Sequence, residues 1–133
     1  MRMIGLVLGF SLMAGTALAG NVNGIWKSEV SDEGGYIHVK IGPCASDAAK
    51  VCGKILKAFS QDPDAPQPEW IGKNIIENMV PDGTNEWDDG TIWAPDDNET
   101  YSSKMKLRGN VLEVSGCVMG GLICRGQDWT RVR

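Results

Sequence analysis

Short runs with the alternation of a β-strand, separated by turn residues, constrain this chain most. In YSSKMKLR (101–108) the odd positions hold Tyr, Ser, Met and Leu, and the even positions hold Ser, Lys, Lys and Arg. This period of two is typical of a strand with one buried face. Other strand-like runs lie at 24–29, 36–41, 53–58, 91–94, 111–118 and 128–133. Helical periodicity is almost absent, so the sequence predicts an all-β protein.

The spacing of these runs indicates how the strands connect. A tight turn at 108–110 (RGN) and a longer one at 94–99 (APDDNE) make the last third of the chain an antiparallel meander. A small up-and-down β-barrel of about eight strands fits this pattern, because closure removes the exposed edges of a sheet. A β-sandwich is the alternative.

The stretch from 59 to 90 differs in character, since it is rich in Pro, Asp, Asn and Gln. We expect it to be mostly loop. Within it, WIGKNIIENMV (70–80) fits either an edge strand or a short helix, and its pattern does not separate the two. A long loop in a compact domain is often functional, here as a lid.

The N-terminus predicts export. Residues 1–19 combine Arg2, an apolar run of about a dozen residues and a small-x-small site ending at Ala19, the features of a signal peptide. The apolar run is shorter than the roughly 20 residues of a membrane span, so no stable membrane anchor is expected. Residues 20–133 then form a single domain in the periplasm or outside the cell.

All four cysteines lie in this exported part and predict two disulfides. Three pairings are possible. We favour the local pairs, Cys44 with Cys52 and Cys117 with Cys124. A zinc site is the alternative, but neither pair has the usual zinc spacing and the one His is far from both in sequence. No metal or other cofactor is therefore expected.

Charge and motifs narrow the function classes. Of the 13 Lys and Arg residues, Arg2 lies in the predicted signal peptide, so 12 basic residues face 17 acidic ones and the net charge is −5. Nucleic acid is an unsuitable partner for such a chain. His38 is the one candidate general base, but alternation places it with Tyr36 and Lys40 on the solvent face of its strand. No catalytic constellation is found, and an enzyme is not predicted.

Several motifs resemble domain-of-unknown-function family 2147, small exported bacterial proteins. The motifs are CGKI (52–55), GTIW (90–93), TYS (100–102), GC (116–117), CR (124–125) and W-x-RV (129–132). The resemblance covers nearly all of the exported part and implies a lipocalin-like, or calycin, β-barrel. It implies no biochemical activity, because none is established for the family.

Calycins tend to carry Gly-x-Trp in the first strand and an Arg in the last that lies across the indole. Gly24, Trp26 and Arg131 fit this pattern here. Trp129 and Arg131 are two apart and share a face, so if Trp129 is in the core, Arg131 needs a partner such as the Trp26 ring. The alternative is an exposed ladder of Trp129, Arg131 and Arg133.

Two binding functions follow from a barrel of this kind. In the first, the open end of the barrel binds a small apolar ligand such as a fatty acid, with Trp70, Trp87, Trp93 and Tyr101 as candidate ligand-binding residues. In the second, the rim or outer surface binds a protein partner in the cell envelope, for example as an inhibitor of a secreted hydrolase. An interior filled by side chains would favour the second function.

Overall fold

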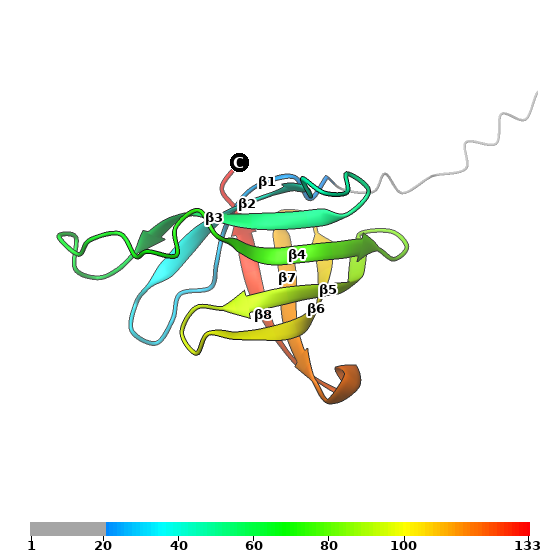
Figure 1. Cartoon of the computed structure of the whole chain (residues 1–133). Coiled ribbons are helices and arrows are strands. Elements are labelled where there is room, and N and C mark those ends of the chain that lie inside the picture. Colours follow the sequence, from blue (N-terminus) through cyan, green and yellow to red (C-terminus); the bar gives the residue numbers. More distant parts are fainter. Residues whose placement is uncertain (1–20) are drawn as a thin grey trace, which may run out of the picture.

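The computed structural model describes residues 21–133, which fold into one closed barrel of eight strands in sequence order (Figure 1). The strands are β1 (Gly24–Lys27), β2 (Tyr36–Pro43), β3 (Val51–Phe59), β4 (Asn74–Pro81), β5 (Glu86–Ala94), β6 (Glu99–Arg108), β7 (Val111–Val118) and β8 (Ile123–Arg131). All neighbouring pairs are antiparallel, including β1 with β8. The predicted antiparallel up-and-down barrel is therefore confirmed, and the β-sandwich is excluded.

The predicted long loop is the main error. The structure places β4 and the first half of β5 between residues 59 and 90, so the loop covers only residues 60–73. Of the two alternatives for residues 70–80, the strand is correct from Asn74 onward, but β4 is not an edge because it pairs with both β3 and β5. Its pattern is irregular because its register shifts against β3 and Asn78 has φ 57°.

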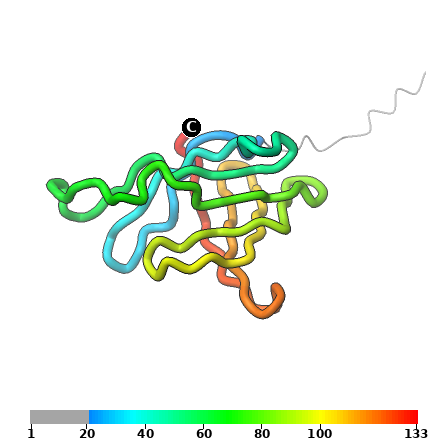
Figure 2. Tube along the Cα trace, in the orientation of Figure 1, coloured from blue at the N-terminus to red at the C-terminus, as the bar shows by residue number. Residues whose placement is uncertain are grey.

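The boundaries of the first and last strands also differ from the prediction. β1 ends at Lys27 instead of residue 29, and β8 begins at Ile123 instead of residue 128. Only two residue pairs join them, Trp26 with Arg131 and Lys27 with Thr130. Figure 2 shows the chain after β1 (blue) turning away from β8 (red) before it returns as β2. The barrel is thus closed by a short seam at one end.

Inward-facing apolar side chains form one core. Val39 and Ile41 of β2 and Met105 and Leu107 of β6 are at most 5% exposed, as their alternation predicted. Trp26 and Trp129 are 0% and 2% exposed and join the core from the two ends of the chain. Fully burying such a side chain stabilises the fold by about 1.5–3 kcal/mol or more.

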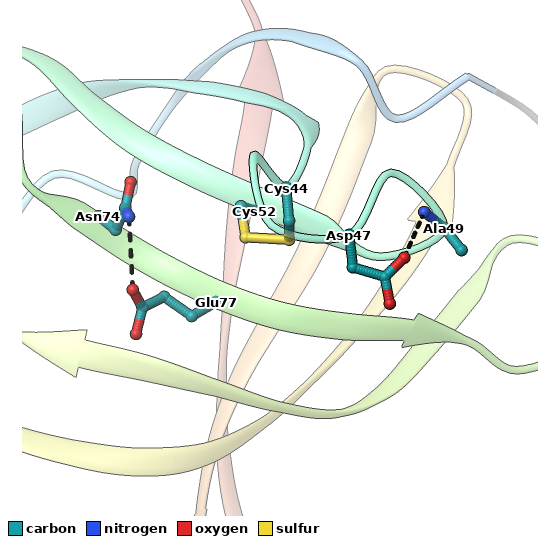
Figure 3. The surroundings of a disulfide bond; sticks show 6 residues. All are labelled: Cys44, Asp47, Ala49, Cys52, Asn74 and Glu77. Atoms are coloured by element: carbon teal, nitrogen blue, oxygen red, sulfur yellow. Dashed lines mark hydrogen bonds between the residues drawn. A yellow bond between two sulfur atoms is a disulfide. The ribbon is translucent and has the colours of Figure 1, made fainter.

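Both disulfides have the predicted local pairing. Cys44 and Cys52 close the connection between β2 and β3, where the Asp47 carboxylate accepts a hydrogen bond from the Ala49 N–H at 3.0 Å (Figure 3). Cys117 and Cys124 lie opposite each other in the β7–β8 ladder. The zinc alternative is therefore wrong, because all four thiols are oxidised.

The disulfides bear on the predicted export. Disulfides persist in oxidising compartments, so the two bridges are compatible with a periplasmic or secreted protein. Within residues 21–133, no helix is long and apolar enough to cross a bilayer. The predicted signal peptide, residues 1–19, lies outside the described residues.

Candidate functional site

Arg131 seals the end of the barrel at which β1 and β8 meet. Its guanidinium carbon lies 4.4 Å from the centroid of the Trp26 ring. Its Nη1 donates to the Asn23 carbonyl at 3.0 Å and its Nη2 to the Asn21 carbonyl at 2.6 Å. Its Nε donates to Oδ1 of Asn110 at 3.2 Å. The side chain thus ties the first strand, the segment before it and the β6–β7 turn together.

Gly24 leaves the space that this arrangement needs. Its φ of 144° is disfavoured for residues with a side chain. A Cβ at Gly24 would lie 2.9 Å from Nη1 of Arg131 and 2.5 Å from the Arg133 carbonyl. The Gly-x-Trp motif and the last-strand Arg are therefore one packing unit. Side chains therefore fill this end of the barrel.

The inner wall of β8 beyond Trp129 has a different character. Gln127 shares the face of the buried Trp129, because its Oε1 accepts a hydrogen bond from the Trp129 Nε1 at 3.2 Å. Arg125 is two residues further along and faces the same way. Both Gln127 and Arg125 are nevertheless exposed. Inward-facing side chains therefore reach solvent along this half of β8.

The short pairing of β1 with β8 explains this exposure. Beyond Lys27 and Thr130 no strand of residues 21–133 pairs with β8 on that side. The Glu29 carboxylate bridges this unpaired side of β8 by accepting a hydrogen bond from the Asp128 N–H at 3.2 Å. We call the unpaired side of β8 the lateral opening. The exposed side chains of Arg125 and Gln127 belong to this part of β8.

Polar and small residues continue this inner wall across neighbouring strands. Register places Ser103 of β6, Gly116 of β7 and Arg125 of β8 in one row. The Ser103 side chain is 2% exposed, and its hydroxyl has no hydrogen-bond partner among residues 21–133. Arg125 has no carboxylate within 4.0 Å in the same part of the chain. A buried hydroxyl and an unpaired guanidinium in one row can bind the polar group of a ligand.

Of the predicted ligand-binding residues, Tyr101 belongs to this wall. It lies on the same face as Ser103, and its hydroxyl donates to Oδ2 of Asp97 at 2.8 Å. This hydrogen bond, together with the negative charge of Asp97, raises the pKa of Tyr101 above its ordinary value.

The three tryptophans lie elsewhere. Trp87 is 8% exposed and belongs to the core, next to Met105 of β6. Trp93 is half-buried and packs against the core, and its Nε1 donates to Oδ1 of Asn98 at 3.0 Å. Trp70 is half-buried in the turn before β4 and packs against the edge of the core. The structure does not bring these three rings together around an opening.

Sequence reasoning missed Ser103, Arg125 and Gln127 as site residues, although one signal pointed to two of them. Residues two apart in a strand share a face, which is how the sequence predicted that Arg131 lies on the face of Trp129. The same rule, applied toward the N-terminus, places Gln127 and Arg125 on that face too. The alternation of residues along the strand did not predict that these side chains are exposed, because their exposure depends on where β1 ends.

Two hollows at the barrel wall are polar. They have volumes of about 310 and 300 Å³, lie over β5, β6 and β7, and adjoin because Asp88 and Lys104 line both. Their other lining residues are mostly charged or small. Ser103 lines the second hollow, and the core residues Trp87 and Met105 line the first. Neither suits an apolar ligand.

Residues 24–131 match a family described as uncharacterised protein conserved in bacteria (DUF2147). The chain belongs to this family. No curated protein matches the sequence. Among solved structures, the chain resembles protein HP1028 from Helicobacter pylori, described as belonging to the lipocalin family. The two share 14% identity over 85% of this chain and 84% of that one, with a TM-score of 0.67. The likeness shows a lipocalin-like fold for this DUF2147 protein.

Proposed function

We propose that this DUF2147 protein is exported, with signal-peptide cleavage near Ala19, and binds one small amphipathic ligand inside its barrel. The observation that carries the proposal is the exposure of Arg125 and Gln127 on the inner face of β8. An eight-stranded barrel is wide enough to hold one small ligand, and the lateral opening would give access to its interior.

The wall indicates what kind of ligand fits. Arg125 supplies an unpaired positive charge, and Ser103 supplies a hydroxyl without a partner. Ile37 and Ile92 are half-buried, face inward and border the core, so they offer apolar surface. An anionic head with an apolar tail, as in a fatty acid, matches this pairing better than a purely apolar molecule.

Titration with dodecanoate, followed by tryptophan fluorescence, tests the proposal, since Trp129 contacts the site through Gln127. We expect Arg125→Gln to weaken dodecanoate binding about tenfold, the loss of one charge-assisted hydrogen bond. Arg108→Gln is the matched control, because Arg108 pairs with Glu113 and Asp128 on the outer face. Native mass spectrometry of protein taken from the oxidising compartment should show a small co-purifying mass. Equal binding of dodecyltrimethylammonium, or equal effects of the two substitutions, would disprove the proposed head-group site.

A second candidate function, binding of an envelope protein such as a secreted hydrolase, is supported by a different observation. The β7–β8 turn projects beyond the rest of the barrel (Figure 1), and its apolar side chains are exposed. They are Val118 at 43%, Met119 at 69%, Leu122 at 84% and Ile123 at 54%. The disulfide at the base of this turn limits the ordering cost of inserting it into a partner pocket.

Inhibition assays against a panel of secreted hydrolases test this second candidate. Leu122→Ser should abolish any inhibition that the turn causes. Val30→Ser, at a residue 50% exposed in another turn, is the matched control. Inhibition that survives Leu122→Ser would place the partner surface elsewhere.

A further inference from the structure

Charge is unevenly distributed around the barrel. The whole chain has 17 acidic residues, yet β1, β2 and β3 contain none. These three strands hold four lysines: Lys27, Lys40, Lys54 and Lys57. A protein with a net negative charge therefore has one wall whose strands carry only positive charges.

Register places these lysines together on the outside of that wall. Lys40 lies between the buried Val39 and Ile41, so it points outward, and it pairs with Lys54 of β3. His38 also points outward and pairs with Lys27 on one side and Lys57 on the other. We call this surface, made by Lys27, Lys40, Lys54 and Lys57, the lysine face.

Three rings form a cluster at one end of the lysine face. Tyr36 and Phe59 stack with centroids 4.6 Å apart, and His38 lies 4.7 Å from Phe59. Nζ of Lys27 lies 4.4 Å from the centroid of Tyr36. Because Phe59 and Lys27 cannot occupy the same side of the Tyr36 ring, both of its sides are covered. This ring is not free to stack on a nucleobase or a sugar.

The positive charges on this face are not neutralised by neighbours. None of the four lysines has a carboxylate within 4.0 Å in residues 21–133. The pKa of His38 is lowered, first by its partial burial and then by the charges of Lys57, Lys27 and Arg133. The charged groups that lower this pKa are all cations. The lysine face therefore has a positive potential of its own.

We propose that the lysine face docks the protein onto an anionic phospholipid bilayer. The charges are spread over the outside of three adjacent strands, and both polar hollows lie over other strands, so the face suits an extended charged surface. Half-buried Tyr and Phe side chains beside lysines are typical of residues at the headgroup level of a bilayer. The negative charge elsewhere in the chain directs this face, and no other, toward the lipid.

The β1–β2 turn limits the strength of binding. It carries Glu29, Asp32 and Glu33 next to the ring cluster, and these carboxylates are repelled by anionic lipid. We therefore expect weak, reversible binding that depends on salt, because the Debye length falls from about 30 Å at 0.01 M to about 10 Å at 0.1 M salt.

Flotation of the oxidised protein with phospholipid vesicles tests the docking. The vesicles contain either phosphatidylcholine alone or phosphatidylcholine with a large fraction of phosphatidylglycerol. Each lysine near such a surface contributes about fivefold to partitioning. Lys54→Gln with Lys57→Gln should therefore lower binding to the anionic vesicles roughly ten- to thirtyfold at low salt. Circular dichroism verifies that the variant is folded.

The matched control is Lys104→Gln with Lys106→Gln. Like Lys54 and Lys57, these two lysines lie on the outside of a single strand, here β6, where they are two residues apart. Their removal should change vesicle binding by less than about twofold. Equal losses in the two double variants, or equal binding to both kinds of vesicle, would overturn the docking face. Tighter binding of a DNA duplex than of anionic vesicles through Lys54 and Lys57 would assign the face to another polyanion and equally overturn it. Neither double variant alters Arg125, so this test is independent of the ligand proposal.

Discussion

Replacing Arg131 by Ala should remove the seal between the two ends of the barrel. The guanidinium makes three hydrogen bonds and covers the Trp26 ring at 4.4 Å. Arg131 is only half-buried, so each bond contributes about 0.5–1 kcal/mol instead of the larger value of a fully buried ionic bond. The stacking on Trp26 adds about 0.5–1 kcal/mol. We expect the free energy of unfolding to fall by about 2–4 kcal/mol.

Arg131→Lys should lose about half of that amount. Lysine keeps the positive charge, but it lacks the planar fork that bonds two carbonyls and Asn110 at once. For a domain of this size, a loss of 1 kcal/mol lowers the melting temperature by roughly 4 °C, so Arg131→Ala should melt about 8–15 °C lower.

Urea unfolding followed by tryptophan fluorescence measures these changes, with the m-value showing whether unfolding remains two-state. Arg108→Ala is the control, because Arg108 makes only exposed ion pairs with Glu113 and Asp128 and should cost less than about 1 kcal/mol. If Arg131→Ala costs no more than Arg108→Ala, the seal does not stabilise the barrel and the reasoning is refuted.

Three further predictions concern other parts of the fold. Gly90→Ala should destabilise the protein by about 2–3 kcal/mol in urea unfolding, because the new Cβ would lie 2.6 Å from a backbone oxygen of β4. Gly42→Ala is the control, because a Cβ at Gly42 would meet no atom within 4 Å, and equal losses of stability in the two variants would contradict the clash. Cys117→Ser with Cys124→Ser should cost about 2–3 kcal/mol in the chain-entropy model, and an unchanged urea midpoint would show that this bridge does not stabilise the fold. His38, whose pKa is lowered on folding, takes up its proton more readily in the unfolded chain, so its contribution to stability is complete above pH 6.5 and is lost as the pH falls through its folded pKa. His38→Gln should flatten that part of the stability profile measured by urea unfolding from pH 5 to 7.5, and an unaltered slope would assign it to other groups.

Local patterns were reliable wherever a single strand or a short loop decided the outcome. Alternation identified the buried faces of β2 and β6, because a strand with one wet side must place every second residue inward. The local cysteine pairings followed from short loops in a chain predicted to be exported. Pattern failed at β4, where Asn78 with φ 57° and the shifts of register against β3 break the period of two.

The candidate site was only partly predictable for a related reason. Gly24, Trp26 and Arg131 could be placed at one end of a barrel from a motif and the direction of a strand. Arg125 and Gln127 could be assigned to the inner face in the same way, but not to solvent. Their exposure depends on β1 ending after four residues while β8 runs for nine.

By itself the sequence determined the all-β class, the two local disulfides and the inward faces of β2 and β6, and the family resemblance implied that Trp26 meets Arg131. The disulfides and the inward faces depend on residues close together in the chain or on a period of two. Only the tertiary structure decided which strands carry the lysine face, where the barrel opens and which inner residues meet water. Those features depend on the register between strands and on the length of the β1–β8 seam, and no single strand encodes either.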